Sequence, residues 1–146
     1  MRKMIMAAVV AGMTYLAASG AQADSIWSKG WDQRSEYWKY STWIYTSIRA
    51  NFGVWPVAWG HTAGIVYTDD GWATATWQNA RWVANVNNPY GGQDEAWEVY
   101  LFGGGCQQMG CGFTPFTFEY ALYVQNSSGQ WTWDNNRGMN YRVNMQ

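Results

Sequence analysis

Charged side chains are scarce in this sequence. They make up 13% of its 146 residues, and acidic groups slightly outnumber basic ones. A nucleic-acid-binding surface needs basic groups that neutralise phosphates, so the composition argues against nucleic acid as a partner. Histidine is scarcer still, because His61 stands alone. It has no neighbouring serine or cysteine nucleophile that would suit a catalytic triad.

Paired carboxylates are the other form of catalysis to consider, because glycosidases use two of them. Asp69 and Asp70 are adjacent in the sequence and would point apart in a strand. Glu95 and Glu98 are a second candidate pair, but nothing in a chain of this size indicates a cleft around them. We therefore expect no enzyme activity and no cofactor.

Long hydrophobic runs are missing except at the start of the chain. A short basic segment and an apolar run over residues 5–18 precede "AQA" at 21–23, which is a cleavage signal. The run is too short to span a membrane and no second run follows, so 1–23 is predicted to be a secretory signal peptide. The mature domain, 24–146, would keep seven basic and ten acidic residues, a net charge of −3. We expect it to be secreted, extracellular or periplasmic, without a membrane span.

Cysteine occurs only twice, as Cys106 and Cys111 in "GGGCQQMGCGF". A structural zinc ion takes four ligands and His61 is far away in the sequence, so no metal is expected. Two close cysteines in an exported protein predict a disulfide instead. Closing so small a loop contributes roughly 2 kcal/mol and would pin a glycine-rich loop rather than hold the fold together.

Aromatic residues, in contrast, are abundant: the chain has 12 tryptophans and 10 tyrosines. A domain of this size cannot bury all of these rings, and exposed tryptophan and tyrosine usually mark a binding surface. The rings lie in short β-branched and aromatic segments separated by turn-forming clusters such as "NFG", "TDDG" and "NSSG". This pattern predicts a single all-β sandwich domain with strands over 40–48, 62–68, 74–83, 96–102, 117–125, 130–133 and 141–144.

The segment 117–133 is the clearest hairpin. Phe118, Tyr120, Leu122 and Val124 alternate with polar or small residues and form the predicted core face. Tyr123 belongs to the other set and is expected to face outward. Two further rings, Trp131 and Trp133, lie two residues apart and share one side of the returning strand. Trp131 is expected in the core, whereas Trp133 begins a turn that can rotate it outward.

The stretch "WTWDNNRGMNYRV", 131–143, has two interpretations. The simpler one is a hairpin with an aromatic core, in which Asn135 and Asn136 stabilise the turn. The sharper one is an aromatic platform edged by amide side chains, which suits a sugar. A pyranose has an apolar C–H face that stacks on an indole, and asparagine offers a donor and an acceptor to adjacent hydroxyls.

Three motifs resemble family 21 carbohydrate-binding modules, the starch- and glycogen-binding domains. They are "WDNNRGMNYRV" at 133–143, "TDDGWAT" at 68–74 and "EYAL" at 119–122, and together the similarity covers about 65–143. The resemblance implies an immunoglobulin-like antiparallel β-sandwich that binds α-glucan and is not catalytic. The loop containing both cysteines is not a feature of the family that can be placed.

The resemblance also implies which residues bind sugar. Trp72 matches the tryptophan of the central turn and Trp133 the aromatic before the D-N-N turn. The asparagines that match are Asn135 and Asn140, and Asn136 lies beside them in the same turn. A further aromatic of some members falls on Ala121 here, so Tyr123 is the expected replacement.

The leading hypothesis is a free-standing secreted protein that binds starch- or glycogen-like polysaccharide. Three roles are open for it: capture of polysaccharide, assistance to a separate secreted amylase, or modification of a cell surface. The alternative is a structural or adhesin-type protein whose aromatic surface binds protein or another polysaccharide. The N-terminal tryptophans also have two interpretations, a second sugar surface or an edge strand packed on the sandwich. Packing is favoured for this group, which comprises Trp27, Trp31, Trp38 and Trp43.

Overall fold

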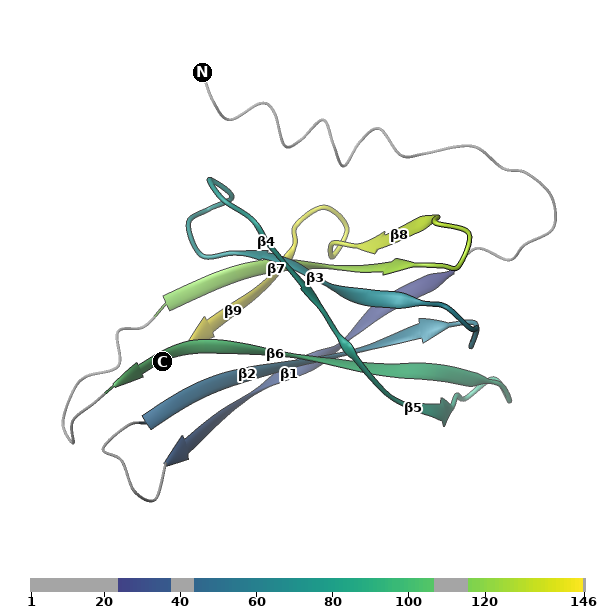
Figure 1. Ribbon diagram of the computed structural model, residues 1–146, viewed down its shortest axis with the longest axis horizontal. Coiled ribbons are helices and arrows are strands. Elements are labelled where there is room, and N and C mark those ends of the chain that lie inside the picture. The colour runs from purple at the N-terminus through teal and green to yellow at the C-terminus, as the bar shows by residue number, and fades with distance from the viewer. Residues whose placement is uncertain (1–23, 38–43, 107–115, 146) are drawn as a thin grey trace.

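Two antiparallel sheets pack face to face in the computed structural model, which describes residues 24–37, 44–106 and 116–145 (Figure 1). Sheet A has the strand order β1-β2-β6-β5, and sheet B has the order β4-β3-β7-β8, with β9 also paired to β7. The strands are β1 (Ser25–Tyr37), β2 (Ile44–Trp55), β3 (Thr62–Thr68), β4 (Thr76–Asn79), β5 (Arg81–Asn87), β6 (Gln93–Cys106), β7 (Phe116–Gln125), β8 (Trp131–Asp134) and β9 (Tyr141–Met145). The predicted antiparallel β-sandwich is confirmed.

The core lies between the sheets and is built by period-two alternation. Every second residue of β2 points inward, and Ile48, Phe52 and Val54 are fully buried there. The predicted inner face of β7 is confirmed, because Phe118, Tyr120, Leu122 and Val124 all belong to the buried cluster. Each such side chain stabilises the fold by about 1.5–3 kcal/mol through burial.

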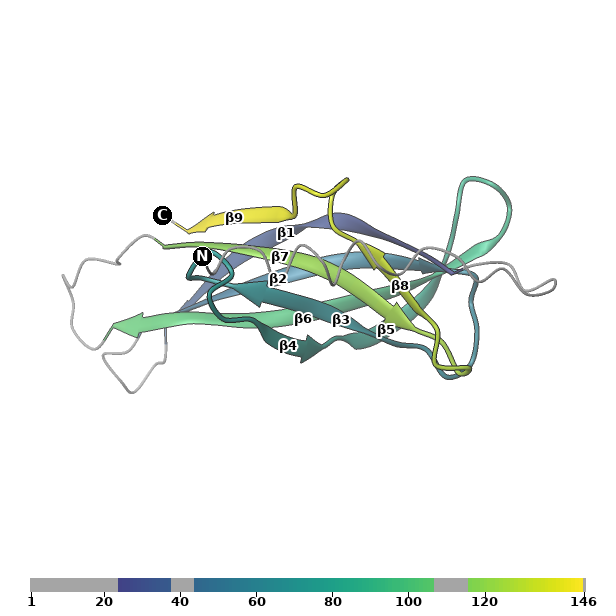
Figure 2. The same ribbon diagram turned by 90° about the horizontal axis from the view of Figure 1, so that it is seen from above.

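The chain crosses between the sheets at Ala80. The segment 74–83 was expected to be one strand, but β4 ends at Asn79 in sheet B and β5 begins at Arg81 in sheet A. The N–H of Ala80 donates to the carbonyl of Ala63 at 2.7 Å, which satisfies its backbone at the crossing. Figure 2 shows β4 and β5 in succession along the lower side of the view.

Two further expectations concern β1 and β2, of which one changes. "NFG", 51–53, was expected to be a turn, but β2 continues through it because Phe52 and Val54 extend the buried alternation. The N-terminal stretch forms edge strand β1, as the packing interpretation predicts, and the ring of Trp27 lies over Gly53. Trp31 opposes Ala50 and is partly exposed.

Several predictions concern residues outside the described ranges. The signal segment 1–23, Trp38, Trp43 and Cys111 all lie there, so the Cys106–Cys111 disulfide stays a prediction. In the ranges that are described, no helix is long and apolar enough to cross a membrane.

Candidate functional site

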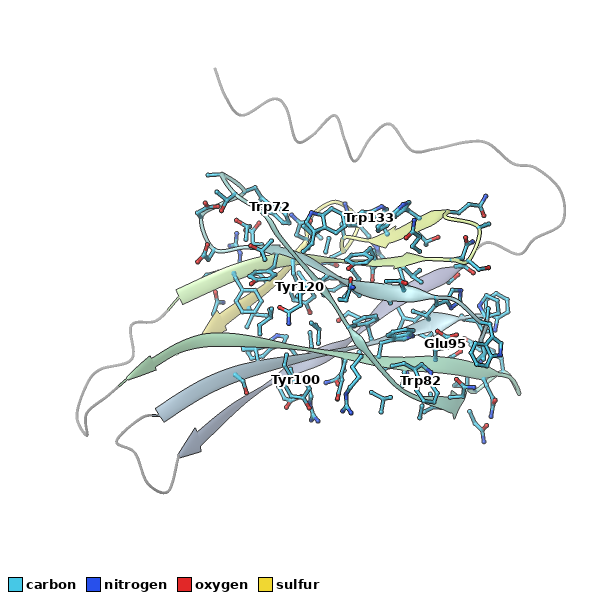
Figure 3. All side chains as sticks on the ribbon, viewed as in Figure 1. Trp72, Trp82, Glu95, Tyr100, Tyr120 and Trp133 are labelled. Carbon is cyan, nitrogen blue, oxygen red and sulfur yellow. The ribbon has the colours of Figure 1, made fainter. Side chains whose placement is uncertain are left out.

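The outer face of sheet B gathers most of the residues singled out by the sequence. Glu119, Ala121 and Tyr123 point outward from β7, because they alternate with its buried core residues. Register places Trp133 of β8 opposite Tyr123, and Arg142 of β9 opposite Glu119. Figure 3 shows the labelled Trp72 and Trp133 on this outer side, away from Trp82 and Tyr100 of sheet A.

Three exposed rings, Trp77, Trp131 and Trp133, form what we call the tryptophan cluster. Their exposed fractions are 54%, 41% and 36%. The rings of Trp131 and Trp133 are nearly parallel, at 16°, with centroids 6.0 Å apart. Trp77 stands at 78° to Trp131 and 75° to Trp133, with centroids at 5.9 and 5.4 Å. The cluster therefore presents ring planes in two directions.

Tyr123 is the floor of the tryptophan cluster rather than part of its surface. It points outward as expected, but it is only 2% exposed because the rings of the cluster lie over it at 5.2–5.7 Å. Its hydroxyl donates to Asn79 Oδ1 at 2.6 Å, and burial raises its pKa. A side chain at Gly64 would collide with this hydroxyl, so glycine there makes room for the tyrosine.

The expectation that Trp131 lies in the core is wrong. Trp131 pairs with Gln125, an outward residue of β7, so its side chain leaves the sheet on the solvent side with Trp133. Trp77 was missed as a site residue. It belongs to β4, where it pairs with Val66 of β3, and the other residues of β4 are polar. A single aromatic ring in a polar strand was the signal that could have identified it.

Trp72 is held by Glu119 at the other end of the same face. It follows β3 with a φ of 69°, in the left-handed region, and its N–H donates to Thr68 Oγ1 at 3.0 Å. Its indole N–H donates to Glu119 Oε2 at 2.7 Å. Arg142 binds the other carboxylate oxygen. Arg142 first and Trp72 second hold the pKa of Glu119 below its usual range.

Asp70 organises the turn that carries Trp72. Its carboxylate accepts hydrogen bonds from the Thr68 hydroxyl at 2.7 Å and from the N–H and hydroxyl of Thr74 at 2.9 and 2.8 Å. These bonds, the backbone bond from Thr74 foremost, lower its pKa to about 2. An ionised carboxylate occupied in this way stabilises a turn and is unsuited to donate a proton.

The asparagines of the turn between β8 and β9 have structural partners. Asn135 Oδ1 accepts from the N–H of Gly138 at 2.9 Å, and Asn136 Nδ2 donates to the carbonyl of Asn140 at 3.1 Å. Asn136 and Asn140 have φ values of 53° and 56°, a conformation that asparagine tolerates. The interpretation that these amides stabilise the turn is supported by these bonds.

The other carboxylates considered for catalysis lie in sheet A. Glu95 is buried and accepts from the indole of Trp97 at 2.9 Å and from the N–H of Ala58 at 2.9 Å, beside the ring of His61. Glu98 is paired with Arg81. Within the described ranges, no three histidine, cysteine or acidic side chains are arranged to hold a metal ion.

Comparison with known proteins places the fold. Neither a protein-family model nor a curated protein sequence matches the chain. The starch-binding domain of Rhizopus oryzae glucoamylase, solved with β-cyclodextrin and maltoheptaose, is similar at a TM-score of 0.54 and 19% identity, over 86% of this chain and 98% of that one. The carbohydrate-binding module of the muscle glycogen-targeting subunit of protein phosphatase 1 gives a TM-score of 0.48 and 18% identity, over 77% and 73% of the two chains. The chain therefore has the β-sandwich fold of a starch-binding domain.

Proposed function

We propose that the outer face of sheet B binds an α-glucan of the starch or glycogen type. The observation that carries the proposal is the tryptophan cluster. Trp77, Trp131 and Trp133 come from two strands on opposite sides of β3 and β7, yet their rings converge with 36–54% of each residue exposed. Exposing three converging indoles to water is unfavourable in the free protein, and a ligand that covers them recovers that free energy.

The ring angles favour a curved polysaccharide. A sugar ring stacks its C–H face on an indole, so the orientation of each indole sets the orientation of the sugar above it. Trp77 stands at 75° or more to both other rings. Successive sugars of an α-1,4-glucan turn along the chain, whereas cellulose and chitin are flat and suit a coplanar row of rings.

The protein acts as a secreted binding module without catalysis of its own. Asp70 and Glu119, two carboxylates at this face, accept hydrogen bonds from the turn after β3 and from β9, which supports binding rather than acid–base chemistry. Export is indicated by the basic, apolar and "AQA" segments of residues 1–23. A module of this kind assists a separate secreted amylase by holding polysaccharide near it. The fold and the three resembling motifs point the same way.

The test is calorimetric titration of residues 24–146 with β-cyclodextrin and with maltoheptaose. A small number of stacked sugars gives on the order of −5 to −7 kcal/mol, a Kd of roughly 10–100 μM. Retention on insoluble starch, with release by maltoheptaose, separates this function from an adhesin that binds protein. Retention on cellulose but not on starch, or no heat at millimolar maltoheptaose, would contradict the proposal.

A further inference from the structure

We infer that Glu119 is the positioning residue of the glucan surface: it fixes the Trp72 ring in line with the tryptophan cluster, so that one glucan chain contacts both. The inference rests on the proposed function and extends it to a residue that does not itself stack on sugar. Glu119 is outward-facing on β7, and its side chain is 21% exposed. It therefore lies beneath the surface that the rings create.

Two segments that are far apart in the sequence meet at this carboxylate. Trp72, in the turn after β3, binds Oε2, and Arg142 of β9 binds Oε1. Because different segments hold the two oxygens, the carboxylate cannot rotate to solvent without breaking at least one of these bonds.

The indole bond gives the half-buried Trp72 ring a directional contact in addition to its packing. The backbone of Trp72 is fixed by the bond from its N–H to Thr68 and by the Asp70 turn. That network ends at the backbone, whereas the 2.7 Å bond from the indole nitrogen to Glu119 acts on the side-chain torsions. It is also a hydrogen bond to a charged group, which is stronger than one between neutral groups.

The resulting surface runs along β7. Trp131 lies opposite Gln125 and Trp133 opposite Tyr123 at one end, and Trp72 is tied to Glu119 at the other. Six residues of extended chain separate the two ends, about 20 Å. A long oligosaccharide can reach from one end to the other, whereas a disaccharide cannot. Glu119 is thus expected to matter more for maltoheptaose than for maltose.

The experiment is a double-mutant cycle on Trp72 and Glu119, with maltoheptaose as the probe. Trp72→Phe keeps an aromatic ring but removes the indole donor, and Glu119→Ala removes the acceptor. Each single variant is expected to weaken binding by about fivefold, and the double variant by little more than Trp72→Phe alone. Maltose binding should change less than twofold in Glu119→Ala. Arg142→Gln is the graded comparison: it removes the other partner of Glu119 but keeps the acceptor of the indole bond, so it should weaken maltoheptaose binding less than Glu119→Ala does.

A spectroscopic signature separates positioning from a general structural effect. In the ligand-free protein, the indole N–H resonance of Trp72, identified by its loss in Trp72→Phe, should move upfield in Glu119→Ala and stay near its place in Arg142→Gln. If Glu119→Ala does not fold, Glu119→Leu, which fills similar space and has no acceptor, is used in the same cycle with the same expectation of non-additive losses. Losses that multiply in the double variant, or an unmoved resonance, would overturn the role of Glu119. A wild-type protein that binds no maltoheptaose would instead overturn the proposed function and, with it, the glucan-positioning role.

Discussion

The two outer faces of the sandwich are covered in opposite ways. On sheet A, alternating charges cross all four strands: Asp32 of β1 binds Arg49 of β2 at 2.9 Å, Glu98 of β6 lies 4.0 Å from Arg49, and Arg81 of β5 binds Glu98. On sheet B, the corresponding positions around Tyr123 carry indoles. The charged side chains on the sheet A face are paired with one another, whereas the indoles on the sheet B face remain in contact with water.

The tryptophans of the two faces show the same difference. Trp27 on sheet A lies against Gly53, where an added Cβ would come within 2.4 Å of its ring, and Lys29 Nζ is 5.9 Å from its centroid. The ring of Trp27 thus contacts residues of its own sheet. Trp131 and Trp133 pack against each other and over Tyr123, but 41% and 36% of each remains exposed. Tryptophan on a strand surface is thus informative only once its ring contacts are known.

The largest expected effect is on stability, at the glycines beneath the rings. Gly64→Ala would place a Cβ 2.3 Å from the backbone oxygen of Gln78 and 2.5 Å from the Tyr123 hydroxyl, so β3 and β4 must move apart. We expect a loss of about 3 kcal/mol in the free energy of unfolding, measured by urea denaturation. Gly53→Ala meets only the side chains of Trp27 and Lys29, which can swing into solvent, and should cost about 1 kcal/mol. Equal losses of unfolding free energy in the two variants would show that the packing around Gly64 in sheet B is no tighter than the packing around Gly53 in sheet A.

The next effect is on ligand binding. Trp131→Ala and Trp133→Ala should each lower glucan affinity about tenfold, because one stacked ring contributes on the order of 1–3 kcal/mol, by analogy with base–aromatic stacking. Unfolding free energies should change by less than about 1 kcal/mol, since both rings are partly exposed.

Trp82→Ala is the control for this comparison. Trp82 lies on edge strand β5 of sheet A and is 49% exposed, similar to the rings of the cluster. Calorimetry should show that the Trp82→Ala variant binds glucan with unchanged affinity, and glucan should still shift the tryptophan fluorescence of this variant. A loss of affinity in Trp82→Ala that matches the loss in Trp133→Ala would move the binding surface to the other sheet.

Sequence patterns predict the sandwich well where one side of a strand is clearly polar. In β7, Glu119 and Gln125 label the outer side, so the inner set was assigned correctly. In β8 the pattern misleads, because Trp131 alternates with the polar Thr132 and the usual rule places the ring inside. The structure places Trp131 outside, opposite Gln125, because its ring packs on Tyr123 at the outer side of sheet B.

Contacts between distant segments are beyond such patterns. The bond between Trp72 and Glu119 joins residues 47 apart, and it depends on the register of β3 with β7 and on the turn after β3. The break at Ala80 is equally invisible, because Trp77 and Trp82 continue one aromatic segment although they belong to different sheets. Motif resemblance singled out Trp72 as a candidate, but its bond to Glu119 emerged only from the fold.

The smallest effect concerns pH and the turn that carries Trp72, for which sheet A has no counterpart among the described residues. Hydrogen bonds from Thr74 and Thr68 lower the pKa of Asp70 to about 2, from its ordinary value of 3.8. A group whose pKa is lower in the folded protein stabilises it above the unfolded value. That contribution is complete above about pH 5 and is lost as pH falls from 3.8 through about 2.

Asp70→Asn should therefore lower the urea midpoint slightly at pH 6, and its difference from wild type should shrink at pH 2. The exposed neighbour Asp69, changed to asparagine, is the matched control and should leave the urea midpoint at pH 6 unchanged, because the bonds from Thr68 and Thr74 go to Asp70. A difference between Asp70→Asn and wild type that is as large at pH 2 as at pH 6 would mean that the turn depends on the shape of the side chain and not on its charge.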